Sequence, residues 1–263
     1  MRKFSKVLAV ILAVLLVASA FAGCGKKADD SSTKAESNNS KTYIIYSDNS
    51  FAPFEYLDKE SNAYIGIDMD ILAAIAEDQG FKYEMHNEGF DAAMGAVQSG
   101  QADAMIAGMT ITDERKETFD FADGYYEDGQ TLVVKADSKI ASEDDLAGKK
   151  VAVKISTQGA TYAESIKDKV GFTTSSYEGS PEMYQAVATG NADACFEDFS
   201  VVKYAIVNEK LALKTVGKVI NPAQYGFAVK KGTNAELIEM FNKGLANIKA
   251  SGKYDEILAK YGG

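Results

Sequence analysis

Residues 107–115 read Ala-Gly-Met-Thr-Ile-Thr-Asp-Glu-Arg and follow a small apolar run, Ala102 to Ile106. The run predicts a buried strand that ends at Gly108. In α/β proteins ligands bind beyond the ends of the sheet strands. The residues that follow this strand are therefore candidate binding residues.

The same stretch carries groups that suit a carboxylate. Thr112 is expected to cap a short helical turn that contains Arg115. The N–H groups of Gly108 and Thr110, the Thr110 hydroxyl and the Arg115 guanidinium could then converge on one anion. Arginine fits this task because its planar fork makes two parallel hydrogen bonds to a carboxylate. For this stretch alone, a surface turn with a solvated arginine is the alternative.

The sequence before this stretch is echoed later in the chain. Residues 96–105 read Ala-Val-Gln-Ser-Gly-Gln-Ala-Asp-Ala-Met, and residues 186–195 read Ala-Val-Ala-Thr-Gly-Asn-Ala-Asp-Ala-Cys. Each copy predicts a helix end, a glycine after it and then a strand. The first copy leads to Arg115, whereas the second leads to Glu197 and Asp198. Two similar lobes that end in a cation and a carboxylate would suit a zwitterion held between them.

The composition is that of an acidic chain with ample material for a core. Of its 263 residues 46% are hydrophobic, and the formal net charge is −10. This length fits one or two domains. The negative charge argues against a nucleic-acid partner, and no basic patch interleaved with aromatics is present. His86, the single histidine, lacks a metal-ligand cluster, so it is expected to be structural, and neither a metal nor a cofactor is expected.

The N-terminus has the pattern of a secretory signal over residues 1–23, with a basic start, an apolar run from Val7 to Val17 and then small residues. That run is too short for a membrane anchor. Phe21-Ala22-Gly23-Cys24 resembles the bacterial lipobox, which implies a lipid on Cys24, although Phe21 replaces the usual leucine. An ordinary cleaved signal is the alternative. Residues 24–41 would form the lipidated cysteine and a flexible tether.

The remaining chain predicts an α/β protein of two lobes. Lobe 1 is expected to comprise residues 42–128 and 225–263, and lobe 2 residues 129–224. The crossings between them are expected at 119–129, which contains two glycines, and at 221–226.

Three local expectations concern helix starts and the core. Asp68 is expected to cap a helix that Gly80 ends. Ser180 is expected to be the N-cap of another helix, with Pro181 at its first position. Cys195 lies in an apolar strand and is expected to be a small core residue outside any disulfide.

Further side chains are expected beside the cleft because they follow strand ends or begin helices. Asp48 follows a strand at 42–46, and Phe51 would form an apolar wall beside it. Phe90 begins a helix and is expected to turn inward. Lys154 ends a strand, and Ser-Thr-Gln-Gly at 156–159 begins a helix, an arrangement that favours anions. Loop packing or an exposed strand end is the alternative for Asp48, Phe51 and Lys154.

The sequence resembles bacterial solute-binding proteins for polar amino acids, the extracytoplasmic receptors of ABC importers. Within that family it is most similar to glutamine-binding proteins. The stretches that carry the resemblance are spread over the chain from about residue 43 to its end. They are Phe51-Ala52-Pro53-Phe54-Glu55, Gly66-Ile67-Asp68-Met69-Asp70, Ile111-Thr112-Asp113-Glu114-Arg115, Asp120-Phe121-Ala122-Asp123-Gly124-Tyr125-Tyr126, Val151-Ala152-Val153-Lys154 and Gln224-Tyr225-Gly226.

The resemblance implies a two-lobed periplasmic-binding-protein (type II) fold, in which each lobe is a mixed sheet flanked by helices and two hinge crossings allow closure on a ligand. It implies that Arg115, with Gly108 and Thr110, holds the α-carboxylate of an amino acid and that Asp198 holds its α-ammonium. The other implied contacts are Phe51 and Phe90 on the aliphatic part of the ligand, Thr157 and Gln158 from lobe 2, and Asp48 with Lys154 at a side-chain amide.

The residues near that amide decide the expected ligand. Glu197 stands where a glutamine-binding relative has histidine, and it either favours a cationic side chain or turns away. Lys154 would repel a basic side chain, whereas Asp48 with Glu197 would repel glutamate. Glutamine, or another neutral polar amino acid, is therefore the expected ligand, and glutamine is favoured since its amide presents both a donor and an acceptor. Basic amino acids such as arginine or lysine are the second candidate, and they require the two acids to outweigh Lys154.

The expected role is that of a monomeric binding protein outside the cytoplasm, held to the cell membrane by its lipid, which delivers the amino acid to the permease subunits of the importer. It is not expected to be an enzyme, because no nucleophile–base pair or metal cluster is present. A cyclohexadienyl dehydratase-like protein with Glu197 or Asp198 as general acid is one alternative. A lipid-tethered sensor is the other.

Overall fold

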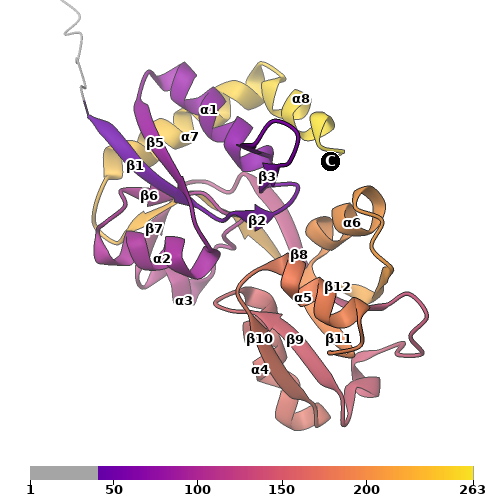
Figure 1. The fold of residues 1–263 in the computed structure, drawn as a ribbon. Coiled ribbons are helices and arrows are strands. Elements are labelled where there is room, and N and C mark those ends of the chain that lie inside the picture. The colour runs from indigo at the N-terminus through magenta and orange to yellow at the C-terminus, as the bar shows by residue number, and fades with distance from the viewer. Residues whose placement is uncertain (1–40, 263) are drawn as a thin grey trace, which may run out of the picture. The chain divides into compact units, whose positions relative to one another are not determined.

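The computed structural model describes residues 41–262 (Figure 1). The predicted signal, Cys24 and the tether up to residue 40 lie outside the described residues. Within residues 41–262, no helix has both the length and the apolar character that a bilayer crossing requires. The chain forms two α/β lobes, each around a five-stranded mixed sheet flanked by helices, as predicted.

The sheet of lobe 1 has the strand order β5-β1-β6-β13-β7. Its first three strands are parallel, and β13 runs antiparallel to both of its neighbours. The strands are β1 (Thr42–Ser47), β5 (Lys82–Asn87), β6 (Ala104–Met105), β7 (Phe119–Phe121) and β13 (Ala228–Lys230). A small separate sheet contains β2 (Ser50–Phe51), β3 (Glu55–Asp58) and β4 (Ala63–Ile65).

Five helices accompany these strands. They are α1 (Ile67–Gln79), α2 (Phe90–Ser99), the short α3 (Asp113–Lys116), α7 (Ala235–Ala250) and α8 (Lys253–Lys260). Helix α1 buries Ile71, Leu72 and Ile75 at helical spacing. Helix α7, the first of the two C-terminal helices, packs against α1 in lobe 1, where Phe241 stacks on Phe227 with ring centroids 4.5 Å apart. The two ends of the described chain therefore share one core.

The sheet of lobe 2 has the order β10-β9-β11-β8-β12, with β9 parallel to both of its neighbours and β8 antiparallel to both of its own. Its strands are β8 (Tyr126–Lys135), β9 (Lys150–Lys154), β10 (Thr173–Tyr177), β11 (Ala194–Asp198) and β12 (Leu213–Tyr225). The helices are α4 (Gln158–Val170), α5 (Ser180–Ala188), α6 (Phe199–Asn208) and the 3₁₀ turn η1 (Glu143–Leu146). Cys195 is fully buried in this lobe, as expected for a core residue.

Two long strands, β8 and β12, link the lobes (Figure 1). They pair antiparallel with each other, and the register places Tyr225 opposite Tyr126. The expected lobe boundaries, at 128/129 and 224/225, fall inside these two strands and stay a prediction. Because the crossings are paired with each other, a change in lobe orientation must bend both.

Three local predictions were wrong, each for a tertiary reason. The strand predicted at 102–106 is only Ala104–Met105, because these are the residues that pair with β1 and β13. Helix α1 begins at Ile67 with Gly66 as N-cap, because the buried Asp68 carboxylate instead accepts hydrogen bonds from distant residues. Ser180 is the first residue of α5 rather than its N-cap, since its side chain is buried in lobe 2 and Gly179 takes the N-cap position.

Candidate functional site

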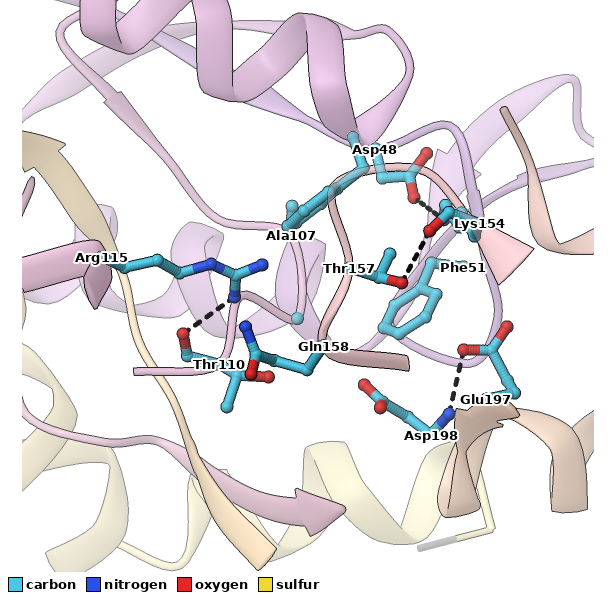
Figure 2. A pocket seen from close by; sticks show the side chains of 12 residues that line it. Asp48, Phe51, Ala107, Thr110, Arg115, Lys154, Thr157, Gln158, Glu197 and Asp198 are labelled. Atoms are coloured by element: carbon cyan, nitrogen blue, oxygen red, sulfur yellow. Dashed lines mark hydrogen bonds and ion pairs between the residues drawn. The ribbon is translucent and has the colours of Figure 1, made fainter. Parts of the chain in front are cut away.

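All eleven residues predicted to bind ligand line one pocket, together with Ala107 (Figure 2). The free volume inside it is about 20 Å³, so the side chains close tightly around the site. Lobe 1 contributes strand ends, loops and helix starts, and lobe 2 contributes the ends of β9 and β11 and the start of α4. The predicted residues are Asp48, Phe51, Phe90, Gly108, Thr110, Arg115, Lys154, Thr157, Gln158, Glu197 and Asp198.

Arg115 is the cation of the lobe 1 side. Thr112 caps α3 as predicted, because its hydroxyl accepts a bond from the Arg115 N–H at 3.1 Å. The guanidinium donates from Nη1 to the carbonyl of Thr110 at 2.9 Å and from Nη2 to the carbonyl of Ser156, in lobe 2, also at 2.9 Å. Burial lowers the pKa of Arg115 to about 10. The group is therefore still charged at neutral pH.

Gly108 differs from its prediction in one respect. Its N–H donates to Oδ2 of Asp68 at 2.8 Å, so it is not aimed at an anion in the pocket. Gly108 still lines the pocket, where a side chain could not fit, because a Cβ would lie 2.4 Å from the Phe51 ring. The cationic side of the pocket consequently depends on Arg115 and Thr110.

Asp198 ends β11 and faces the pocket opposite Arg115 (Figure 2). Its Oδ1 accepts from Gln130 on β8 at 3.0 Å, and its Oδ2 accepts from the hydroxyl of Tyr225, at the end of β12, at 2.5 Å. Burial raises the pKa of Asp198, and these two bonds and the charge of Arg115 oppose that rise. A cation placed beside Asp198 would restore the balance.

Glu197 is directed toward its own lobe. Oε2 accepts from the Tyr184 hydroxyl at 3.0 Å and Oε1 from the N–H of Asp198 at 2.9 Å. Burial and the neighbouring Asp198 raise the pKa of Glu197 to about 7. The carboxylate thus lines the pocket while its bonds hold it to lobe 2.

Asp48 and Lys154 form an ion pair that joins the two lobes, and each side chain is only 1–2% exposed. The Lys154 ammonium also lies 4.8 Å from the centroid of the Phe51 ring. Burial by itself lowers the pKa of Lys154, but Asp48 and Glu197 outweigh it and the pKa is raised. The two groups predicted to face a ligand amide therefore also hold each other.

The remaining pocket residues surround this arrangement. Thr157 caps α4, accepting from the Ala160 N–H at 3.2 Å, and donates to the Lys154 carbonyl at 2.8 Å. Gln158 is the first residue of α4, so the positive end of that helix meets the pocket. The Arg115 guanidinium carbon lies 5.4 Å from the centroid of the Phe90 ring. Both aromatic walls therefore lie within cation–π range of a buried cation.

Contacts outside the pocket also bridge the lobes. The Ser156 hydroxyl donates to Asp91 on α2, and the hydroxyls of Tyr56 and Tyr204 are 3.2 Å apart. Ser156 has a φ of +61°, a backbone conformation that favours glycine. The structure thus shows the lobes in contact on both sides of the pocket.

Sequence reasoning missed the partners that hold the pocket residues in place. Gln130 and Tyr184 gave no signal, because each acts through a bond to a residue at least thirteen positions away. Tyr225 lies in a stretch that carries the family resemblance, which could have singled it out. Within residues 41–262, no group of three or more His, Cys, Asp or Glu side chains is arranged to hold a metal.

Comparison with known proteins identifies relatives over the whole described chain. Residues 43–263 match the family model of bacterial extracellular solute-binding proteins, family 3. A probable histidine-binding protein of Neisseria gonorrhoeae is 32% identical, covering 96% of this chain and 94% of that protein. The ABC transporter glutamine-binding protein GlnH of Bacillus subtilis is also 32% identical, covering 98% and 96% respectively.

Two solved structures inform the arrangement of the lobes. An ancestral arginine-binding protein bound to arginine is 37% identical over 84% of this chain and 98% of its own, with a TM-score of 0.78. The second substrate-binding domain of Lactococcus lactis GlnP, in an open conformation, is 43% identical over 84% and 94%, yet its TM-score is 0.59. The greater likeness to the ligand-bound structure agrees with the contacts across the pocket. The fold is that of the type II periplasmic binding proteins, as predicted.

Proposed function

This chain belongs to family 3 of the bacterial extracellular solute-binding proteins, and we propose that it is the amino acid-binding subunit of an ABC importer, with glutamine as its ligand. One observation carries the proposal: Arg115 from lobe 1 and Asp198 from lobe 2 face the same buried pocket (Figure 2). The α-carboxylate and α-ammonium of an amino acid match these two charges.

The mechanism follows from where the two charges sit. Arg115 would bind the α-carboxylate with its fork, and Asp198 would accept from the α-ammonium. Charge-assisted bonds of this kind contribute about 1.5–3 kcal/mol each. They form together only when the lobes approach, so the ligand binds the closed arrangement more tightly and shifts the population toward it. The permease subunits would then recognise the closed form.

Glutamine is favoured by the Asp48–Lys154 pair. The carboxylate accepts hydrogen bonds and the ammonium donates them, which are the two requirements of a side-chain amide. A neutral amide adds no charge to a pair that is already balanced and almost fully buried. A basic side chain would instead bring a third charge next to Lys154.

A basic amino acid is the second candidate, because the pocket has one acid in excess. Its lining contains Asp48, Glu197 and Asp198 but only two cations, Arg115 and Lys154. Once a zwitterion has bound Arg115 and Asp198, and Lys154 has paired with Asp48, Glu197 alone lacks a cation. A positively charged side chain would neutralise it.

Calorimetric titration of the refolded, ligand-free protein with each amino acid tests the proposal. Tight binding of glutamine, with arginine, lysine and histidine weak, is expected. Lys154→Met should weaken glutamine binding and improve binding of basic amino acids relative to it, whereas Glu197→Gln should change glutamine affinity by less than about threefold. Tight arginine binding that falls at least about tenfold in Glu197→Gln would instead establish the second candidate. Binding of no amino acid would overturn both, and turnover of prephenate or arogenate would then be assayed.

We also propose that the protein is a monomer held at the outer face of the cell membrane by a lipid on Cys24. The lipobox-like sequence that ends at Cys24 supports this location. Metabolic labelling with palmitate should mark the wild-type chain and leave Cys24→Ala unlabelled, with the variant released from the membrane fraction. Equal labelling of both chains would refute the anchor.

A further inference from the structure

A second acidic cluster lies behind the pocket, in the interior of lobe 1. Glu55, at the start of β3, and Asp68, in the first turn of α1, both have no exposed surface. Their two carboxyl groups are within hydrogen-bond reach of each other. One oxygen of Asp68, Oδ2, accepts from the Gly108 N–H at 2.8 Å and from the Tyr125 hydroxyl at 2.7 Å. That oxygen is therefore satisfied.

The other three oxygens of the pair have no donor if both groups are ionised. These are Oδ1 of Asp68 and both carboxyl oxygens of Glu55. Two adjacent carboxylates cannot bond to each other, because both only accept. A proton on Glu55 removes the conflict, since the resulting hydroxyl can donate to Asp68 while the negative charge of the pair falls from two to one.

The charged groups around the pair do not replace that proton. Glu55 is faced by Asp68, Asp48 and Lys154, and Asp68 by Glu55 and the hydroxyl of Tyr125. Lys154 is the one cation among them, and its ammonium is paired with Asp48. Two like charges buried side by side without their own cation are strongly unfavourable.

We propose that Glu55 and Asp68 share one proton and that this carboxyl–carboxylate pair positions Gly108 and Phe51 in the wall of the ligand pocket. The pair connects α1 and β3 to the loop of Gly108 and, through Tyr125, to the segment just before β8. Phe51 lies on β2, which pairs with β3 so that Phe51 is opposite Glu55. The close packing of Phe51 on Gly108 leaves no room for a Cβ, so a shift in the pair reaches the pocket directly.

Two variants of equal size separate the shared proton from simple packing. Glu55→Gln keeps a donor for Asp68 in the form of its amide, whereas Glu55→Met fills the same space without one. Glu55→Gln is expected to bind the amino acid ligand within about threefold of wild type, and Glu55→Met to lose at least about tenfold. Equal affinities of the two variants would overturn the proposal. This binding readout rests on the proposed function.

The proton itself is tested without a ligand by side-chain carboxyl NMR of the wild-type chain. The Glu55 carboxyl should keep its proton to a clearly higher pH than an ordinary glutamate side chain does. Deprotonation of Glu55 in the usual acidic range of a glutamate side chain would overturn the proposal even if every variant folds. If the carboxyl keeps its proton but no amino acid binds, the proposed function fails and the shared proton stands.

Thermal unfolding over a pH series gives a further check. Burial, and then the charge of Asp68, raise the pKa of Glu55 well above its ordinary value. The stability that the proton contributes is complete below the unfolded-state pKa and is lost as the pH rises through the folded-state pKa. The melting temperature of wild type should therefore fall relative to that of Glu55→Gln as the pH is raised from about 5 to about 8. Parallel curves would contradict a shared proton.

Discussion

The strands β6 and β11 lead toward the pocket from opposite lobes. Both strands start within the repeated sequence at 96–105 and 186–195. Asp103 and Asp193 occupy the same position of the repeat. Oδ2 of Asp103 accepts from the Ile44 N–H at 2.9 Å, and Oδ2 of Asp193 accepts from the Lys150 N–H at 2.9 Å. The N–H of each aspartate donates to the carbonyl of that same partner residue at 2.8 Å. The repeat therefore attaches each strand to its neighbour in the sheet.

After this shared part the two copies differ. Strand β6 stops at Met105, and the chain continues as a loop that leads to Arg115 on a short helix. Strand β11 continues to Asp198, because β8 pairs with it along its full length. Lobe 1 thus presents a cation from beyond its strand, and lobe 2 presents carboxylates on the strand itself. The repeat determines the scaffold, and the residues after it determine the charge.

Asp198→Asn is expected to have the largest effect on ligand affinity, because it removes the carboxylate at the end of β11 while keeping the shape of the side chain. Ligand affinity should fall about 100-fold or more, since the α-ammonium would lose its buried charge partner. The ligand-free protein should keep or gain thermal stability, because burial raises the pKa of Asp198 and its charged form opposes folding. Calorimetry and thermal unfolding measure the two effects. Affinity within a few-fold of wild type would show that this strand end does not bind the ligand.

Arg115→Lys is the matching change on the lobe 1 side. It keeps the charge but removes the fork that contacts Thr110 and Ser156. Affinity should fall by about 10- to 100-fold, because a lysine cannot make the two parallel bonds to a carboxylate. Titration of the variant with the same ligand checks this. Wild-type affinity would mean that charge alone is sufficient at this end.

The two sides of the pocket should also contribute differently to the pH dependence of stability, because the surplus acid, Glu197, belongs to lobe 2. Burial and Asp198 raise the pKa of Glu197 to about 7, from an ordinary value of 4.5. The stabilising contribution of its proton is complete below the ordinary pKa and is lost as the pH rises through about 7. The melting temperature of the ligand-free protein should therefore fall from about pH 5 to about pH 7.5. Glu197→Gln should show a smaller fall, and an unchanged slope would exclude Glu197 as a source.

Ser156→Gly is expected to have the smallest effect, at the rim where the lobes meet. Glycine accepts the positive φ of this position and keeps the carbonyl that Arg115 contacts, but it removes the hydroxyl bond to Asp91. The ligand should dissociate about threefold faster, because one exposed hydrogen bond of the closed arrangement is lost. Stopped-flow measurement of dissociation, with Asp91→Asn as the partner variant, tests this. A slower dissociation would show that strain at Ser156 matters more than its bond.

The sequence predicted well those features that depend on neighbouring residues. Helix ends at glycine, the Thr112 cap and the charged groups beyond the two strands all follow from local pattern, and the structure brings those charged groups to one pocket. Asp68 shows the limit of such reasoning. Near a helix start an aspartate resembles a cap, but this one is buried and bonds to Gly108, forty residues away.

The same limit applies to pairing inside the pocket. Asp48 and Lys154 could be predicted to face a common ligand, yet nothing in their spacing shows that they contact each other across 106 positions. The direction of Glu197 likewise depends on Tyr184, which lies on a helix with no feature that marks it as a site residue. The positions of strand ends predict which side chains come together. Burial and hydrogen bonds to other residues decide how those side chains pair.

Tyr225 gives the molecule an optical property of its own. Its ring stacks on Tyr126 with centroids 5.9 Å apart, and its hydroxyl bonds to Asp198, so one chromophore contacts both crossings and the lobe 2 strand end. The chain has 14 tyrosines and no tryptophan, so its near-ultraviolet spectrum is not masked by indole absorption. Lobe motion should therefore change the tyrosine absorption and fluorescence of the native protein, without any attached label.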